Sequence, residues 1–120
     1  MSDRAEVNTL TGADDIIAEM ARRIVETVNP ERIILFGSRA KGNARPDSDV
    51  DLMVIESEPF GPGRSRFREA GRLWRALRTF PFSKDILLFS RDEIEQWRAA
   101  TNHIIAHAMR DGRVIYERTR

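Results

Sequence analysis

Apolar residues recur at every third or fourth position in three parts of the chain, a spacing that predicts amphipathic helices. The helices are expected over residues 11–28, 65–78 and 91–110, the last with a break near its middle. The third begins with the capping pattern of Ser90 and Glu93, in which each side chain bonds the backbone of the other residue. The apolar side chains expected to face inward on the second and third helices are Phe67, Ala70, Leu73, Trp74, Leu77, Ile94 and Trp97.

Short apolar runs lie between these helices and are bounded by turn-forming residues, which predicts strands. The expected strands cover residues 31–36, 49–55, 84–89 and 113–117, the last as a short edge strand. Helices and strands that alternate in this way indicate an α/β (α+β) fold in which helices pack against a small mixed sheet. We expect a single domain over residues 1–120, with residues 1–10 flexible.

The composition narrows the class of protein. With 120 residues, of which 41% are hydrophobic and 32% charged, the chain is typical of a soluble globular protein. A net charge of +1 argues against a general nucleic-acid-binding surface, and the lack of cysteine excludes disulfides and thiolate metal sites. No apolar run approaches the roughly 18 residues that span a membrane. Residues 1–6 lack the apolar centre of a signal peptide, so we expect a cytoplasmic protein.

The densest candidate chemistry lies at the end of the first strand. This strand ends at Phe36, and Gly37 then allows a sharp turn or a close approach to a ligand. A helical turn starting at Ser38 would offer free backbone N–H groups and a positive dipole end to phosphate. We expect Ser38 to bind triphosphate rather than to act as a nucleophile, because no histidine lies near it in sequence; a plain helix cap is the alternative role, and the two are compatible. Arg39 and Lys41 are candidate phosphate contacts, with solvated loop charges as an equal alternative.

Two carboxylates follow at the start of the second strand. Asp49 and Asp51 are one residue apart, so on a strand both side chains point to the same face, about 7 Å apart. Two like charges on one face are unfavourable unless a cation neutralises them. Oxygen ligands of this kind suit Mg²⁺ or Mn²⁺. A phosphate-binding corner beside a divalent-metal site is the minimum needed to transfer a phosphoryl or nucleotidyl group.

This stretch resembles the signature of the DNA-polymerase-β-like nucleotidyltransferase superfamily: Gly37 and Ser38, ten intervening residues, then Asp49 and Asp51. The short chain is similar to the minimal nucleotidyltransferases, which are encoded beside small helical HEPN-domain proteins as toxin–antitoxin pairs. The resemblance covers about residues 16–117 and implies a polymerase-β-like fold. It also implies that Asp49 and Asp51 hold metal ions while the glycine–serine corner holds the triphosphate of a nucleotide.

The third predicted strand supplies a further carboxylate. Metal-assisted transfer needs an acid that binds the catalytic metal or takes the proton from the attacking hydroxyl. The resemblance implies that this acid comes from the strand after the second helix, where Asp85 is the only acid. The alternative is a solvated aspartate at a strand end. We therefore expect Asp85 to be both a catalytic residue and a metal ligand.

The function that the resemblance implies is Mg²⁺-dependent nucleotidyl transfer with two ions, for which Mn²⁺ could substitute. AMP would pass from ATP to a hydroxyl, and the expected acceptor is a tyrosine of a HEPN-type toxin, which makes the chain an antitoxin. Two alternatives stay open. One is a non-catalytic antitoxin that neutralises the toxin by forming a complex, and the other is nucleotidyl transfer to RNA. RNA is not favoured, because the net charge is close to zero.

Two further clusters carry weaker signals. His103 and His107 are four residues apart, as zinc ligands can be, but no glutamate of a metalloprotease motif lies between them, so zinc is not expected. A run of arginines could form a basic surface for RNA or for an acidic protein, although a solvated helix face is the favoured interpretation. The run consists of Arg64, Arg66, Arg68, Arg72, Arg75 and Arg78.

Overall fold

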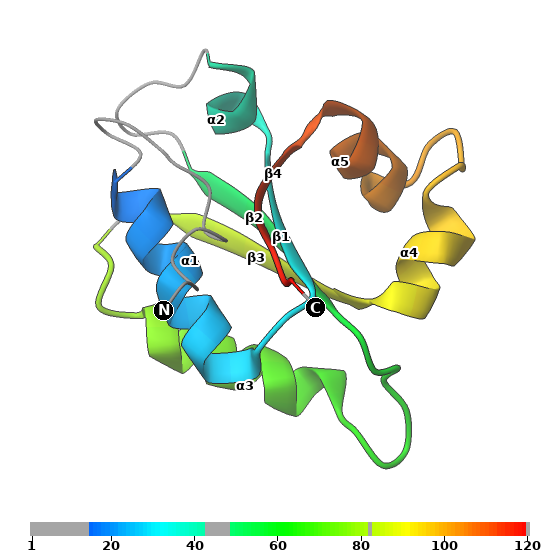
Figure 1. The fold of residues 1–120 in the computed structure, drawn as a ribbon, viewed down its shortest axis with the longest axis horizontal. Coiled ribbons are helices and arrows are strands. Elements are labelled where there is room, and N and C mark those ends of the chain that lie inside the picture. The colour runs from blue at the N-terminus through cyan, green and yellow to red at the C-terminus, as the bar shows by residue number, and fades with distance from the viewer. Residues whose placement is uncertain (1–14, 43–48, 82, 120) are drawn as a thin grey trace.

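A four-stranded mixed sheet lies at the centre of the protein, in the strand order β3-β2-β1-β4 (Figure 1). The computed structural model describes residues 15–42, 49–81 and 83–119. The strands are β1 (Arg32–Phe36), β2 (Val50–Glu56), β3 (Lys84–Ser90) and β4 (Arg113–Glu117). β1 runs antiparallel to its neighbours β2 and β4, whereas β2 and β3 are parallel. The expected small mixed sheet is therefore confirmed.

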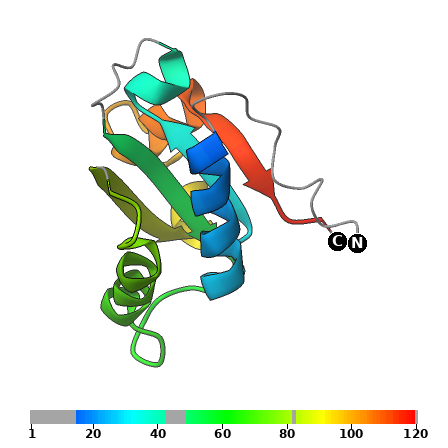
Figure 2. The same ribbon diagram turned by 90° about the vertical axis from the view of Figure 1, so that its left-hand side faces the viewer.

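Helices cover both faces of this sheet. In the described part of the chain they are α1 (Asp15–Val28), α2 (Ser38–Lys41), α3 (Arg66–Leu77), α4 (Arg91–Trp97) and α5 (Ile104–Asp111). α1 and α3 pack on one face, and α4 and α5 lie on the other; Figure 2 shows α1 in front of the sheet and α5 behind it. α3 connects the parallel strands β2 and β3, since parallel neighbours cannot be joined by a tight hairpin.

The hydrophobic core has one layer on each side of the sheet, because side chains along a strand alternate between its faces. Ile33 and Leu35 of β1 pack with buried residues of α1 and α3, whereas Ile34 packs with buried residues of α4 and α5. β2 is buried at every position except Asp51, as expected of a strand that helices cover on both sides. Asp51 therefore lies where this cover ends.

The local signals at helix ends are confirmed. Ser65 is the N-cap of α3, and its side chain accepts a hydrogen bond from the Arg68 backbone N–H. Ser90 and Glu93 form the predicted capping box of α4. The last predicted helix is indeed broken, into α4 and α5, and β4 is an edge strand as expected. The predicted helix start at residue 11 lies outside the described residues.

Three predictions of inward-facing aromatic residues are wrong. Phe67 of α3 is 88% exposed and Trp74 is 42% exposed. Since an α-helix turns about 100° per residue, Phe67 lies roughly 90° from the line of Leu73 and Leu77, through which α3 contacts the core. Trp97, at the end of α4, is 39% exposed and its ring stacks on that of His103, 4.5 Å between centroids.

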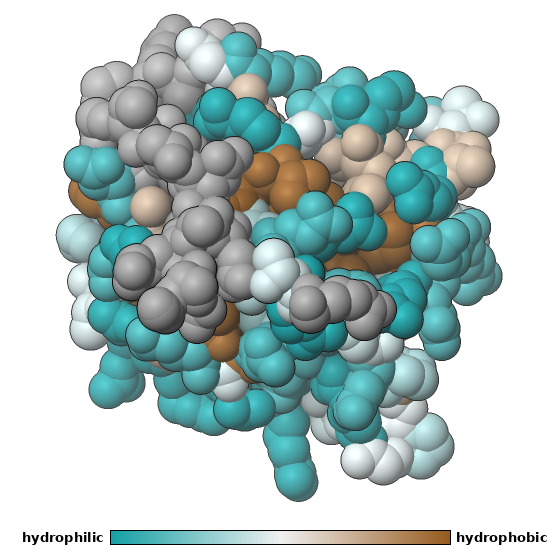
Figure 3. Space-filling view, in the orientation of Figure 1, coloured by the Kyte–Doolittle hydropathy of each residue, from teal (hydrophilic) through white to brown (hydrophobic). Residues whose placement is uncertain are grey.

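The surface is mainly polar in the view of Figure 3, with hydrophobic residues gathered near β4 and α5. Val114 of β4 and Ile104 of α5 are among the exposed hydrophobic residues. Within the described ranges, the helices are too short or too polar to cross a lipid bilayer.

Candidate active site

The predicted site residues meet at one end of the sheet. Phe36, the last residue of β1, is the register partner of Asp51 in β2, and Asp51 is in turn the register partner of Asp85 in β3. Asp49 directly precedes β2. Neighbouring strands lie about 4.8 Å apart, so the glycine–serine corner after β1 and the acids of β2 and β3 are adjacent. Strand pairing thus brings together residues that are up to 48 positions apart in the sequence.

The acids lie on the face of the sheet that α4 and α5 cover. Residues 53 and 55 of β2 belong to that side of the core, and Asp51 shares their face because strand side chains alternate. Asp51 is half-buried, whereas Asp49 and Asp85 are exposed. The site therefore consists of one partly covered carboxylate between two carboxylates that a solute can reach.

Gly37 is fitted closely to Asp51. Its φ of +75° lies in the region that L-residues rarely adopt. A Cβ atom at this position would lie 2.3 Å from Oδ2 of Asp51, well inside van der Waals contact. Only glycine can therefore turn the chain here and leave room for the carboxylate.

The turn after Gly37 is a single helical turn, α2. The backbone N–H groups of Ala40 and Lys41 donate to the Gly37 carbonyl at 3.1 and 3.3 Å. The N–H groups of Ser38 and Arg39 come before them in the turn, so they take no part in the hydrogen bonds within the helix. Four residues make a weak dipole, so local N–H groups rather than a macrodipole would attract phosphate. The helix start at Ser38 is confirmed, but Gly37 holds the N-cap position and no side chain caps it, so the alternative role of Ser38 as a helix cap is wrong.

The two basic residues of the turn differ in their surroundings. Arg39 is half-buried, whereas Lys41 is exposed and lines a cavity of about 250 Å³ beside Gly37. The opposite wall of this cavity belongs to α5 and includes His107 and Asp111. Sequence reasoning missed the α5 wall, since nothing in the linear chain places α5 beside α2. The only indication in the sequence was the four-residue spacing of His107 and Asp111, which puts both side chains on one face of a helix.

The negative charges of the neighbouring carboxylates act on Asp51 electrostatically. Burial first, and then the negative charges of Asp85 and Asp49, raise the pKa of Asp51. None of the three acids forms an ion pair with a basic side chain in the described ranges. The same residues contain no group of three His, Cys, Asp or Glu side chains placed to hold a metal ion together. Metal binding by Asp49, Asp51 and Asp85 therefore stays a prediction.

The histidines of the weaker zinc hypothesis have other contacts. His103 is the N-cap of α5, and its Nδ1 accepts a hydrogen bond from the Ile105 backbone at 3.1 Å. The ring of His107 lies 2.7 Å from the Arg110 guanidinium. Both rings therefore contribute to the structure of α5 and its N-terminal cap.

Comparison with solved structures shows a common fold. A protein from Sulfolobus solfataricus assigned as a nucleotidyltransferase aligns with a TM-score of 0.50 at 21% identity, over 83% of this chain and 79% of that one. A toxin–antitoxin structure with AMP-PNP aligns with a TM-score of 0.50 at 20% identity, over 83% and 73%. The toxin–antitoxin MntA-HpeT, in a mutant form, aligns with a TM-score of 0.46 at 19% identity, over 90% and 75%.

Comparison of sequences is more specific. No curated protein matches this chain significantly. The family model described as polymerase beta, nucleotidyltransferase, matches residues 19–120, which include every predicted site residue. Because this match spans most of the sequence and coincides with the glycine–serine corner and the three strand acids, the chain belongs to the polymerase beta nucleotidyltransferase family.

Proposed function

We propose that this nucleotidyltransferase is Mg²⁺-dependent and transfers AMP from ATP to a hydroxyl group. The observation that carries the proposal is the position of Asp51, which lies against Gly37 on one side and pairs in register with Asp85 on the other. ATP as the donor is supported by the toxin–antitoxin neighbour, whose structure contains AMP-PNP, an ATP analogue.

The donor set at this corner suits a divalent cation. Asp49, Asp51 and Asp85 offer carboxylate oxygens, the ligands that Mg²⁺ and Mn²⁺ prefer. Positive charge would also relieve the repulsion that helps raise the pKa of Asp51. We infer that Asp49 and Asp51 would hold two ions and that Asp85 would complete the catalytic one. When bound, such ions neutralise the triphosphate and make the attacking hydroxyl easier to ionise.

The other residues of the corner would bind the nucleotide. Gly37 and Ser38 would hold the triphosphate through backbone N–H groups and the serine hydroxyl, since a glycine lets phosphate approach the backbone. Arg39 and Lys41 would add positive charge beside it. Asp85 is exposed, so an acceptor hydroxyl can reach it and give up its proton there. The acceptor oxygen then bonds to the α-phosphorus, the bond from that phosphorus to the bridging oxygen breaks, and pyrophosphate leaves.

The acceptor that we propose is a tyrosine of a HEPN-type toxin, which would make this protein an antitoxin. The toxin–antitoxin neighbour and the resemblance to minimal nucleotidyltransferases support this choice. Asp49 and Asp85 are exposed, so a macromolecular acceptor has access to the site. Neutralisation by complex formation alone and transfer to RNA are the alternatives that the experiment must separate.

The test uses the full chain, Mg²⁺ and ATP labelled at the α-phosphate, with the HEPN-type protein encoded beside it as acceptor. Wild type and Asp92→Asn, a control at an exposed aspartate of α4, should label the acceptor equally. Asp51→Asn and Asp85→Asn should each lower the rate by about a hundredfold or more. Labelled tyrosine, identified by mass spectrometry, would support the proposal.

The alternatives give different results. Unlabelled partner in a stable complex with the wild type would favour neutralisation by binding. Label that appears only when RNA is added, and on the RNA, would favour an RNA acceptor. Full labelling by Asp51→Asn would exclude the mechanism proposed here.

A further inference from the structure

The outward face of α3 combines exposed aromatic rings with arginines and contains no acid. Because a helix turns about 100° per residue, one arc of α3 begins about a quarter turn from the line of Leu73 and Leu77 and extends to the side that faces away from the core. Phe67 and Trp74, both exposed, lie about 10 Å apart along this arc. We call this arc the α3 stripe; it consists of Phe67, Arg68, Gly71, Trp74, Arg75 and Arg78.

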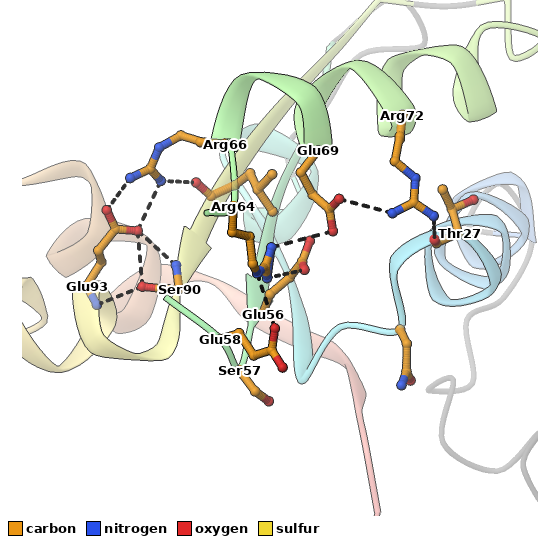
Figure 4. Close-up of polar contacts among 12 residues, drawn as sticks. Thr27, Glu56, Ser57, Glu58, Arg64, Arg66, Glu69, Arg72, Ser90 and Glu93 are labelled. Carbon is orange, nitrogen blue, oxygen red and sulfur yellow. Dashed lines mark hydrogen bonds and ion pairs between the residues drawn. The ribbon is translucent and has the colours of Figure 1, made fainter. Parts of the chain in front are cut away.

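The arginines in and around α3 fall into two groups. Figure 4 shows the first group, in which Arg64, Arg66 and Arg72 are each paired with a glutamate. These pairs use Glu56, Glu93 and Glu69, respectively. The second group is the three arginines of the α3 stripe, whose exposed side chains form no ion pair or hydrogen bond with another described residue. The α3 stripe therefore presents three uncompensated positive charges around two aromatic rings.

The C-terminal end of the α3 stripe lies beside the start of β3, the strand that carries Asp85. At the start of α3, the Arg66 guanidinium donates to the Leu88 carbonyl near the end of β3. At the other end of α3, the Trp74 ring lies 6.0 Å from Nζ of Lys84, which directly precedes Asp85. α3 thus runs antiparallel to β3, the strand at the edge of the sheet. Because strand side chains alternate, Asp85 itself points to the α4/α5 face, so a molecule seated on the α3 stripe would reach the site only around the β3 edge.

We propose that the α3 stripe docks an acidic protein surface with apolar residues at its centre, on the partner that supplies the acceptor hydroxyl. This inference rests on the proposed function. Exposed Phe and Trp surrounded by Arg is the composition that marks the core of protein interfaces, where Trp and Arg contribute most of the binding energy. Negative charge opposite these three guanidinium groups would complement them.

Other occupants fit the α3 stripe less well. RNA binding draws on a broad cationic surface, but the neighbouring arginines lie beside the carboxylates of Glu58, Glu69 and Glu93, and the whole chain carries only +1. A second copy of this chain, related by twofold symmetry across the α3 stripe, would place like charges against one another. An acidic protein partner satisfies both the rings and the charges.

The test measures the affinity of the full chain for the HEPN-type partner by biolayer interferometry. Phe67→Ala and Arg75→Glu should each weaken binding about tenfold or more, and higher salt should weaken wild-type binding. Arg113→Glu, at an exposed position of β4 away from α3, is the matched control and should bind like wild type. Phe67 has almost no buried contacts to lose, so its replacement should leave the melting temperature unchanged.

The remaining outcomes separate this inference from the proposed function. Asp51→Asn should bind the partner like wild type, since docking does not need catalysis. If Phe67→Ala and Arg75→Glu bind the partner normally while the wild type labels it, the docking surface is wrong and the proposed function stands. If both variants lose binding but the wild type transfers no label, docking stands and the proposed function is wrong. If a 20-nucleotide single-stranded RNA, or a second copy of the chain, binds through these residues instead, the protein occupant is wrong.

Discussion

At the level of single residues, the contact between Gly37 and Asp51 constrains the site most tightly. Two independent requirements fall on Gly37, since its backbone has a positive φ and its missing Cβ leaves space for a carboxylate oxygen. Either requirement alone would favour glycine. Together they fix the position of the Gly37 backbone, which we propose binds phosphate, relative to Asp51, which we propose binds metal.

Gly37→Ala should therefore damage both stability and activity. The strained backbone costs about 1–3 kcal/mol, because φ 75° with ψ −157° is a conformation adopted almost only by glycine, and the new methyl group must displace the Asp51 side chain. We expect a lower melting temperature and at least a tenfold slower nucleotidyl transfer. Gly61→Ala is the control, because φ there is ordinary and nothing lies within 4 Å of the added Cβ, so both quantities should stay at wild-type values. Equal transfer rates for the two variants would contradict the account of Gly37.

Glu56, at the far end of β2, is a buried acid that the proposed reaction does not use. It is 4% exposed and accepts a hydrogen bond from Arg64 at 2.7 Å, with Glu58 and Glu69 close to the same guanidinium (Figure 4). Its Oε2 atom has no hydrogen-bond partner among the described residues. Burial first, and then the neighbouring carboxyl group of Glu69, raise the pKa of Glu56 to about 8.

This pKa predicts that stability falls as the pH rises. Between about pH 4.5 and 8, the folded protein keeps the Glu56 proton and the unfolded chain does not, so the free energy of unfolding decreases until the folded protein also ionises. Glu56→Gln stays neutral, so its melting temperature should change less over this interval and exceed that of the wild type at pH 9. Glu58→Gln, at an exposed neighbour, should keep the wild-type slope. Parallel curves for wild type and Glu56→Gln would show that Glu56 ionises normally.

Among the secondary-structure elements, the start of α4 has the best-defined local chemistry. The Ser90 side chain caps the Glu93 backbone while Glu93 bonds the Ser90 backbone N–H at 2.8 Å. Glu93 also pairs with Arg66 at the start of α3 (Figure 4). One capping box therefore fixes the end of β3, the start of α4 and the N-terminus of α3 together.

Ser90→Ala should remove the cap and cost about 1 kcal/mol of stability. For a domain of this size we expect the melting temperature to fall by about 3–5 °C. Ser83→Ala, at an exposed serine just before β3, should change the melting temperature by less than about 1 °C. Since the site lies at the opposite end of β3, nucleotidyl transfer below the melting temperature should be unaffected. A Ser90→Ala protein as stable as the wild type would mean that Arg66 and Glu93 hold this junction without the cap.

Local chemistry also explains which elements the sequence could predict. Caps such as Ser65 and Ser90 act on residues a few positions away, so their patterns can be recognised without the rest of the fold. The orientation of a helix against the core depends on distant residues. Phe67 and Trp74 belong to an apolar helix face by spacing, but the residues of α3 that enter the core are Leu73 and Leu77, with Ala70 partly buried beside them.

For the molecule as a whole, the fold matters because it assembles one corner from three separate strands. The sequence alone could place Asp49 and Asp51 beside each other, since they are one residue apart where β2 begins. The pairing of Asp51 with Asp85 depends on a parallel register that no local pattern specifies, and only the family resemblance indicated it. The family resemblance did not indicate the cavity wall that α5 contributes, so His107 and Asp111 were not predicted as site residues.

The most direct test of this corner is calorimetric titration of Mg²⁺ and AMP-PNP into the full chain. Wild type and Asp92→Asn should bind the nucleotide with similar affinity when Mg²⁺ is present, and much more weakly when EDTA removes it. Asp51→Asn should lose most of the Mg²⁺-dependent affinity, because the carboxylate between Gly37 and Asp85 would no longer carry its charge. Nucleotide binding by Asp51→Asn that matches the wild type, with or without Mg²⁺, would contradict the assignment of this corner as the metal–nucleotide site.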